Sequence, residues 1–310
     1  MNILITRHDK IGDFITTLPL FYVVKKHHPT AKIYALVSKI NFELAQQVDF
    51  IDEVILYEKN HFWIMFKQLR AAKINTSISA FIDTRLGWLL FLSGIKTRIA
   101  PATKLAQLFF NKTLKQRRSR VEKTEFEYNL DLAKILNKDI DLSFDTPLLK
   151  LEKNTDFRVK QHLGDKKIVL LHPGYGGSSD GNLPLSDYIK LAKTVSEIDN
   201  IQAVWTFGPD DLEGKKQLQE ILPKALIYQP PTLLDFCQLI NDSNLLISTS
   251  TGPMHLAGAL NINTISFFGN NLFASQKRWA TVSNAPKQHN VLVDNADFEE
   301  IKVIMLKICD

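Results

Sequence analysis

The chain alternates between short apolar runs, typical of buried strands, and amphipathic runs, typical of helices, and it completes this alternation twice. The first series begins with NILIT (2–6) and the second with KIVLLHPG (167–174). Between the two series, residues 137–156 are polar, contain a proline and keep no period. Strands that alternate with helices form parallel sheets covered by helices on both faces. The pattern therefore predicts an α/β protein of two Rossmann-like domains, which 310 residues are enough to build.

Apolar runs bounded by turn residues predict nine strands. They cover residues 2–6, 32–38, 53–57 and 77–83 in the first series, and 167–174, 202–208, 225–229, 245–248 and 263–269 in the second. The intervening residues predict helices, among them a continuous helix over 124–137 and a last amphipathic helix over 297–309. In open α/β sheets, ligands bind beyond the carboxyl ends of strands, where the strand order reverses. The polar segments that follow strands are therefore the candidate sites.

The composition is that of a soluble globular protein, with 45% hydrophobic and 23% charged residues. The strongly apolar run Leu86–Ile95 is about half as long as a membrane span. The opening residues MNILITRHDK lack the apolar core of a signal peptide. Cys237 and Cys309 form neither a metal-spaced set nor a disulfide framework, which suits a reducing compartment. We therefore expect a cytoplasmic protein.

The first candidate segment is TRHDKIGDFITTLP (6–19), which follows the first strand. It has a single glycine, so a standard dinucleotide-binding turn is not supported. Asp13 stands where the loop turns into a helix, either as a helix N-cap or as a carboxylate available as a general base. Arg7, His8 and Lys10 are either surface charges or groups that attract an anionic substrate.

The second candidate segment is HPGYGGSSDGNLP (172–184). Three of the four residues 174–177 are glycine, and Ser178 and Ser179 follow them. Glycine lets backbone N–H groups approach a phosphate closely, and serine hydroxyls add donors. The segment lacks the Lys-Ser/Thr pair of a P-loop, and a flexible turn is the alternative interpretation. Its position after a strand and before a helix favours phosphate binding.

The third candidate segment, FGPDDLEG (207–214), places acids after a strand. Asp210, Asp211 and Glu213 could bind the ribose or base of a nucleoside, and Asp210 and Glu213 are the assigned candidates. The alternative is that these acids stabilise a helix N-terminus through its dipole. In the first series, Arg85 follows the strand 77–83 and is a candidate for acceptor binding.

The fourth candidate segment is LLISTSTGPMHLAGAL (245–260), where a strand passes into a helix. Pro253 suits the first position of a helix because no N–H is needed there. The free N–H groups of residues 254–256 and the helix dipole would then form an anion site. The candidate diphosphate-binding residues of this segment are Ser250, Thr251, Gly252 and His255.

The net charge of +5 is concentrated in KTLKQRRSRVEK (112–123), which has six cations and a single acid. Such a run is either a solvated loop or helix face, or a site for an anionic partner. The mild overall excess gives no reason to expect nucleic-acid binding. Under the second interpretation, Arg117, Arg118 and Arg120 are candidates for binding an anionic acceptor.

Taken together, these segments resemble the ADP-heptose:lipopolysaccharide heptosyltransferase family, glycosyltransferase family 9. ILITRHDKIGDFITTLPL resembles the opening strand of the family with its Gly-Asp and Thr-x-Pro. FLSGIKTRIAP resembles its Gly-Ile…Arg-Ile segment, and EFEYNLDLAKIL its Glu…Asn-Leu helix. LLHPGYGGS and STSTGPMHLAGAL, followed by ISFFG, resemble its donor-binding half.

The resemblance implies the GT-B architecture, in which two Rossmann-like domains with parallel sheets face a central cleft. Its implied parts are an acceptor domain over 1–155, a nucleotide-sugar domain over 156–296, and a C-terminal helix over 297–310 that packs back on the first domain. It also implies inverting transfer from a nucleoside-diphosphate sugar, ADP-heptose or similar, with no metal and no other cofactor. Asp13 matches the family's general base, and Thr251, Gly252 and His255 match its pyrophosphate-binding motif.

The sequence departs from the family pattern at two points. Ser250 stands where many members have an acid, and residues 181–184 lack a lysine that often precedes Trp-Pro there. The transferred sugar is therefore open, and a non-catalytic nucleotide-sugar-binding module remains an alternative. A nicotinamide oxidoreductase is not supported, because the glycine fingerprint and the acid after the second strand are missing.

The basic run 112–123 suits an anionic glycan or lipid-linked acceptor. An acceptor of this class would place the protein peripherally at the inner face of the cytoplasmic membrane, and we state this as a hypothesis.

Overall fold

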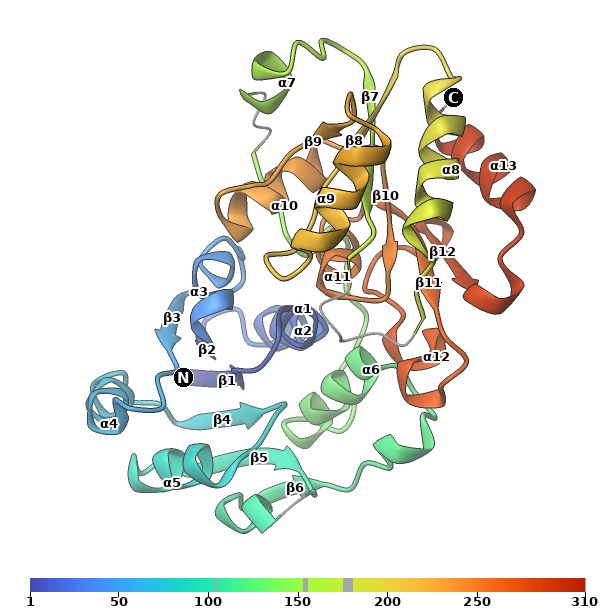
Figure 1. Ribbon diagram of the computed structural model, residues 1–310. Helices are drawn as coiled ribbons and strands as arrows, with labels where there is room; N and C mark the ends of the chain where they lie inside the picture. Colours follow the sequence, from blue (N-terminus) through green and yellow to red (C-terminus); the bar gives the residue numbers. More distant parts are fainter. Residues whose placement is uncertain (104, 153–155, 175–180, 310) are drawn as a thin grey trace. The chain divides into compact units, whose positions relative to one another are not determined.

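The chain folds into two units, Met1–Lys150 and Leu151–Asp310, each built on its own sheet (Figure 1). The computed structural model describes residues 1–103, 105–152, 156–174 and 181–309. The boundary between the units lies within the polar segment 137–156 that the sequence marks as a break. The predicted α/β class with two parallel sheets is confirmed.

The first unit has a six-stranded parallel sheet in the order β3-β2-β1-β4-β5-β6. Its strands are β1 (Asn2–Arg7), β2 (Lys32–Val37), β3 (Glu53–Leu56), β4 (Thr76–Ser79), β5 (Thr97–Pro101) and β6 (Lys112–Leu114). Its α-helices are α1 (Ile11–Ile15), α2 (Leu18–His27), α3 (Lys39–Ala45), α4 (Phe62–Ala71), α5 (Thr84–Leu92) and α6 (Glu125–Leu130). Three 3-10 helices complete it: η1 (Leu105–Phe109), η2 (Arg118–Arg120) and η3 (Asp131–Ile135).

The second unit has a six-stranded parallel sheet in the order β12-β11-β10-β7-β8-β9. Its strands are β7 (Lys167–His172), β8 (Ile201–Trp205), β9 (Leu226–Ile227), β10 (Leu245–Thr249), β11 (Asn263–Phe268) and β12 (Gln288–Leu292). Its α-helices are α7 (Asp156–Lys160), α8 (Leu185–Ser196), α9 (Leu212–Ile221), α10 (Leu233–Asn241), α11 (Gly252–Ala259), α12 (Gln276–Trp279) and α13 (Phe298–Cys309). Its 3-10 helices are η4 (Leu272–Ala274), η5 (Ala285–Lys287) and η6 (Val293–Asn295).

Both sheets have the same topology. In each, the first strand lies at the centre, the second and third continue to one side, and the fourth to sixth continue to the other. The strand order therefore reverses between β1 and β4 in the first unit, and between β7 and β10 in the second. Ligands of open α/β sheets bind beyond the carboxyl ends of such strands. The loops that follow β1, β4, β7 and β10 are thus the places where chemistry is expected.

Helices cover the first sheet on both faces because its strands are apolar on both. Leu4 of β1 faces a core that also takes in buried residues of α4, α5 and η1. Ile3 and Ile5 are fully buried and alternate with Leu4, so they face the opposite side of the sheet. A strand buried on both faces is typical of parallel sheets.

The last helix, α13, packs in the core of the second unit. Ile301, Met305 and Cys309 lie buried in the core cluster that contains Tyr188 and Leu191 of α8. Figure 1 shows α8 and α13 side by side. The apolar stripe of this helix, at helical spacing, is therefore buried within the second unit, and its packing on the first domain stays a prediction.

Several predicted elements differ in extent. The strand expected over 77–83 ends at Ser79, because Asp83 begins the next helix as its N-cap. The helix expected over 124–137 divides into α6 and the 3-10 helix η3. Strands β5, β6 and β12 were not predicted, and β12 has the mixed sequence QHNVL with only partial burial.

Candidate functional site

Three carboxylates surround the guanidinium of Arg7 at the carboxyl end of β1. Its Nε donates to Asp9 Oδ1 at 2.8 Å, and its Nη2 donates to Asp13 Oδ1. Glu125 Oε1, from α6, lies 3.8 Å from Nη1. Arg7 is almost fully buried, so it is not the surface cation that would attract an acceptor. That expectation is corrected: the role of Arg7 is to hold the three acids together.

Asp13 lies on α1, one turn after the end of β1, and it does not cap the helix. The N-cap is Lys10, which makes no side-chain cap hydrogen bond. The backbone carbonyl of Asp13 accepts hydrogen bonds from the hydroxyls of Thr16 and Thr17, both at 2.9 Å. Its side chain is 17% exposed, so the carboxylate is fixed by its neighbours and still reached by solvent.

The pKa of Asp13 is raised to about 6. Burial is the largest cause, because it penalises the charged carboxylate. The positive charge of Arg7 opposes this, whereas the negative charges of Asp9 and Glu125 add to it. A carboxylate with such a pKa is ionised at neutral pH and is a better proton acceptor than an ordinary aspartate.

Helix α6 supports this arrangement from a distant part of the sequence. Glu125 binds Arg118 Nη1 and faces Arg7, while Arg118 Nη2 donates to Asn129 Oδ1 at 3.2 Å. Asn129 Nδ2 donates to the backbone carbonyl of Thr16 at 3.1 Å. Arg118 is therefore bound in an ion pair and is not available to an acceptor, which corrects its assignment. Asp9, Glu125 and Asn129 were not assigned from the sequence, because no local spacing shows these contacts.

His8 belongs to a second cluster at the same edge of the sheet. Its Nε2 lies 2.9 Å from Asp83 Oδ2, and its ring stacks on Tyr57 with centroids 4.1 Å apart. Burial alone would raise the pKa of Asp83, but hydrogen bonds from His8 and from the backbone N–H of Leu86 lower that pKa to about 2. The same burial, with the charge of Asp83, raises the pKa of Tyr57 to about 12. His8 is therefore not a surface charge, so that interpretation is wrong. It still lies beside the candidate site, as the sequence predicted.

The remaining candidates for acceptor binding are exposed. Lys10 and Arg117 lie open to solvent. Arg85 lies in the first turn of α5, not at the end of a strand, with its guanidinium 5.6 Å from the ring centre of Phe62. Arg120 pairs loosely with Glu122 at 3.7 Å and is mostly exposed. These four cations remain available to an anionic ligand.

In the second unit, β10 runs into α11 through Ser250 and Thr251. Thr251 is the N-cap, and Pro253 is the second helical position, one later than expected. The Thr251 hydroxyl makes no cap hydrogen bond to the helix. The His255 N–H already donates to the Thr251 carbonyl at 3.4 Å, so only the N–H groups before it in the first turn keep their capacity to bind an anion.

His255 lies in the first turn of α11 and is nearly fully buried. Burial lowers its pKa to about 4, so it is neutral at physiological pH. Its Nδ1 has no hydrogen-bond partner among the described residues, and its ring lies 5.9 Å from that of Trp279. A neutral imidazole with an unsatisfied ring nitrogen can donate or accept one hydrogen bond to a ligand.

The glycine-rich loop is described at its two ends, and Ser178 and Ser179 lie outside the described residues. At one end, a Cβ on Gly174 would overlap the carboxylate of Asp211. At the other end, a Cβ on Gly181 would overlap the backbone of Phe268 and Gly269. Only glycine fits at position 181, because the overlap there is with backbone, whereas the overlap at Gly174 is with the end of the Asp211 side chain. The two described ends of the loop thus lie against the start of α9 and against the end of β11.

In the acidic loop after β8, the carboxylates do not all lie where the sequence predicted. Asp210 and Glu213 are exposed, and Glu213 accepts from Gln217 at 3.1 Å on the same helix. Asp211 instead faces the loop end, where its Oδ2 accepts from the Gly208 N–H at 3.2 Å. Of the three acids of this segment, the structure therefore places Asp211 against the described end of the glycine-rich loop.

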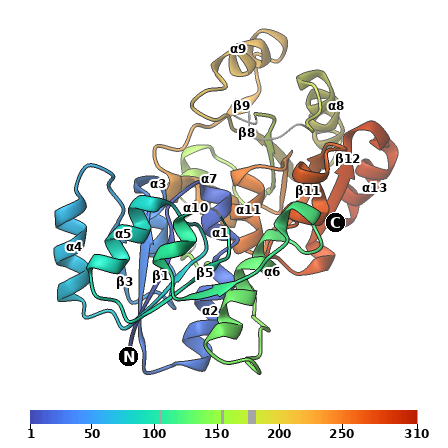
Figure 2. The same cartoon turned by 90° about the horizontal axis from the view of Figure 1, so that it is seen from below.

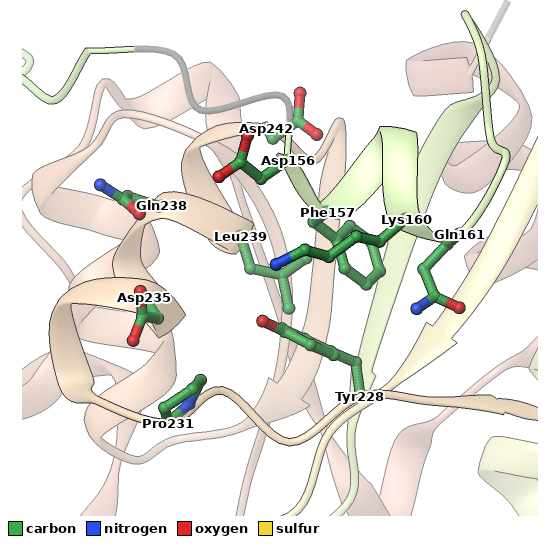
Figure 3. Close-up of a pocket in the computed structure, with 10 residues that line it drawn as sticks. All are labelled: Asp156, Phe157, Lys160, Gln161, Tyr228, Pro231, Asp235, Gln238, Leu239 and Asp242. Atoms are coloured by element: carbon green, nitrogen blue, oxygen red, sulfur yellow. The ribbon is translucent and has the colours of Figure 1, made fainter.

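A cavity of about 150 Å³ lies elsewhere in the second unit, between α7, α10 and the segment after β9. Figure 3 shows the amino group of Lys160 and the hydroxyl of Tyr228 directed to the same side of it. Tyr228 stacks on Phe157 with ring centroids 4.6 Å apart. The residues that line the cavity include none of the sequence-predicted candidates.

Among the described residues, no group of three or more His, Cys, Asp or Glu side chains is arranged to hold a metal ion. Within the same described ranges, every helix is too short or too polar to cross a bilayer.

The fold is that of the GT-B glycosyltransferases. The structure aligns with that of the E. coli ADP-heptose lps heptosyltransferase II at a TM-score of 0.84 and 16% identity, over 100% of this chain and 98% of that one. It also aligns with a glycosyl transferase family 9 structure from Veillonella parvula at a TM-score of 0.79 and 18% identity, over 100% and 90% of the two chains. At such identities the likeness establishes the fold.

Sequence comparison establishes the family. Residues 63–301 match the model of glycosyltransferase family 9 (heptosyltransferase). A Haemophilus influenzae protein named "Putative glycosyltransferase" is 35% identical over 92% of this chain and 87% of its own length. The lipooligosaccharide heptosyltransferase 2 of Campylobacter jejuni is 24% identical over 90% and 84%. The chain belongs to glycosyltransferase family 9, and the expected resemblance is confirmed.

Proposed function

We propose that this protein is an inverting glycosyltransferase that transfers heptose or a related sugar from a nucleoside-diphosphate sugar, ADP-heptose or similar, to a lipopolysaccharide-type acceptor, with Asp13 as general base. Family membership supports the glycosyltransferase activity. The family match begins at residue 63, so the role of Asp13 is argued from its own surroundings. The observation that carries it is a solvent-reached carboxylate with a pKa of about 6 at the carboxyl end of β1.

In the proposed reaction, Asp13 takes the proton of the acceptor hydroxyl while that oxygen attacks the anomeric carbon. The new glycosidic bond forms as the bond from the anomeric carbon to the diphosphate breaks, and the nucleoside diphosphate leaves with the bonding pair. Attack opposite to the leaving group inverts the anomeric configuration. General-base help of this kind is worth about 10²–10⁴ in rate.

The leaving diphosphate gains negative charge as its bond breaks. We assign its stabilisation to the N–H groups at the start of α11, the Thr251 hydroxyl and the neutral ring of His255, in place of a metal ion. Ser250 adds a hydroxyl, and Ser178 and Ser179 are proposed to add donors from the glycine-rich loop. Asp210 and Glu213 remain proposals for binding the nucleoside, and so does Asp211, whose carboxylate lies at the loop after β8.

The acceptor is proposed to be anionic, because Lys10 after β1 and Arg85 after β4 are exposed cations that would attract negative charge. Arg117 and Arg120 are proposed to contribute from the basic run, whereas Arg118 is held by Glu125. A lipid-linked acceptor would bring the protein to a membrane surface.

The test is a transfer assay against ADP-, UDP-, GDP- and CMP-sugars, comparing wild type with Asp13→Asn. Asp13→Asn keeps the shape of the side chain and removes the base, so turnover should fall by about 10²–10⁴ while donor affinity is kept. Asp49→Asn is the matched control, because Asp49 is 68% exposed and pairs only loosely with Lys150. Donor binding with equal turnover in wild type and Asp13→Asn would refute the base, and donor binding with no transfer in wild type would favour a non-catalytic binding module.

A further inference from the structure

The helical layer of α4, α5 and η1 is apolar on both of its sides. Its inner side contributes Met65, Leu86 and Leu90 to the core of the first unit. Its outer side carries six large apolar side chains that are 43% to 84% exposed: Trp63, Trp88, Phe91, Leu92, Leu105 and Leu108. A helix at an ordinary protein surface is polar on its outer side. We call these six residues the outer apolar face.

The outer apolar face is a continuous, built surface. Helices α4 and α5 lie side by side (Figure 1 and Figure 2). Gly87 lets η1 approach α5 closely, because a Cβ there would lie 2.6 Å from Cδ2 of Phe109. Trp88 stacks on Phe109 with ring centroids 4.8 Å apart. The exposed leucines of η1 are therefore seated directly beside the exposed aromatic residues of α5.

The charge of this region is almost entirely positive. Residues 59–121 contain thirteen lysines and arginines and a single carboxylate, Asp83, although the whole chain has a net charge of only +5. Lys67, Lys96 and Lys112 are exposed and have no described carboxylate within ion-pair distance. The guanidinium of Arg98 lies 5.3 Å from the ring centre of Phe91. The charged side chains of the segment that carries the outer apolar face are thus almost all cations, and Arg98 lies against the face itself.

We infer that the outer apolar face docks the protein on an anionic lipid surface. Tryptophan and leucine side chains insert at the boundary between headgroups and acyl chains, while lysines and arginines bind the anionic headgroups. This inference rests on the proposed function, because a transferase that uses a lipid-linked acceptor meets that acceptor at a lipid surface. Arg85, in the first turn of α5 after Asp83, links the surface to the cluster of His8.

A second copy of this chain is the less favoured occupant. A symmetric dimer places the same patch of each copy against the other. Two strongly positive regions would then face each other, and like charges across an interface cost binding energy. An anionic bilayer instead complements both the apolar side chains and the cations.

The experiment measures binding of the full chain to vesicles, without donor or acceptor, so that its result is independent of transfer activity. Wild type should sediment with phosphatidylcholine vesicles containing 30% phosphatidylglycerol, and binding should fall with added salt and with phosphatidylcholine alone. Leu105→Ser with Leu108→Ser should weaken binding on the order of tenfold per leucine. Lys67→Gln with Lys112→Gln should weaken it about fivefold per cation.

The matched control is Leu212→Ser with Ile221→Ser. These two aliphatic side chains lie on α9 and are 65% and 58% exposed. Binding equal in the control and in the Leu105/Leu108 variant would overturn the proposal, as would binding that ignores phosphatidylglycerol. The charge variant keeps the test decisive where the leucine variant unfolds. Light scattering without lipid decides the alternative: a dimer that the same leucine substitutions dissociate would assign the face to a second copy.

Discussion

Both units have the same sheet topology, and in both a helix follows the fourth strand. The N-termini of these two helices are nevertheless capped differently. In the first unit, the carboxylate of Asp83 caps α5 by accepting from the Leu86 N–H at 2.7 Å. In the second unit, Thr251 is the N-cap of α11 and its hydroxyl makes no such bond. One start is satisfied within the protein, and the other is left available for a ligand. The topology alone therefore does not decide what binds.

The first strands of the two sheets show the same contrast in charge. Beyond β1 lies a network of Arg7 with Asp9, Asp13 and Glu125, in which every member is ionisable. At the carboxyl ends of β7 and β10 lie glycines, hydroxyls and two histidines, His172 and His255, and burial lowers the pKa of each to about 4. A charged site suits proton transfer, and a neutral site rich in N–H donors suits a diphosphate. The two units thus divide the proposed reaction between them.

The largest effect should come from removing the cation of the first unit. Arg7→Met leaves Asp9, Asp13 and Glu125 without their shared partner, and an uncompensated buried charge costs about 3–5 kcal/mol. We expect the free energy of unfolding in urea to fall by that amount. Arg120→Met is the control, because Arg120 is exposed and its loose pair with Glu122 should contribute less than about 1 kcal/mol. A loss for Arg7→Met as small as that of the control would show that the three acids do not depend on Arg7.

In the second unit, a substitution that adds volume should have the large effect that a change of charge has in the first unit. Gly181→Ala places a methyl group on the backbone of Phe268 and Gly269, so the end of the glycine-rich loop must move. Overpacking of this kind costs about 1–3 kcal/mol, and we expect donor affinity to fall at least about tenfold by calorimetry. Gly214→Ala is the control, since its Cβ would lie 3.5 Å from Phe207 in an ordinary contact. Unchanged donor binding in Gly181→Ala would remove this loop from the donor site.

The sequence predicted these strand ends because central strands of parallel sheets are nearly continuous apolar runs. NILIT and LLIS show this pattern, and the polar residues after them were correctly expected at the sheet edge. Strand β12, with the sequence QHNVL, lies at the edge of its sheet with partial burial, so it has no such pattern. The fold class can therefore be predicted from the central strands. The edge strands form through tertiary pairing and cannot be predicted from an apolar run.

The contacts of the candidate site were less predictable than its position. Arg7, His8 and Arg118 look like surface cations in the sequence, yet each binds a carboxylate. The partner of His8 lies 75 residues along the chain. Glu125 reaches Arg7 from 118 residues away, through the packing of α6, and periodicity carries no information on such pairs. The residue types were visible, but their partners required the fold.

The pH dependence should separate the two units. Asp13, with a pKa raised to about 6, must be ionised to act as a base, so kcat/KM should fall about tenfold per pH unit below 6. Donor affinity should stay flat between pH 5 and 8, because His255 is already neutral there. The raised pKa also means that the stabilisation by neutral Asp13 is lost as pH rises through about 6, and Asp13→Asn should remove that loss. Parallel pH profiles of kcat/KM and of the donor dissociation constant make the measurement; a donor affinity that follows the same limb would contradict the division.

The smallest effect returns to the two helix starts. Asp83→Ala removes both the cap hydrogen bond and the hydrogen bond to His8, and it should lower the free energy of unfolding by about 1–2 kcal/mol. That contribution needs the carboxylate ionised, so it should fade as pH drops below about 4 toward the Asp83 pKa of about 2. Thr251→Val keeps the shape of the side chain and removes a hydroxyl that caps nothing, so the unfolding free energy should change by less than about 0.5 kcal/mol. Donor binding should nevertheless weaken severalfold in Thr251→Val and not in Asp83→Ala. If instead Thr251→Val costs as much stability as Asp83→Ala, the start of α11 is an ordinary capped helix, and the diphosphate must be held elsewhere.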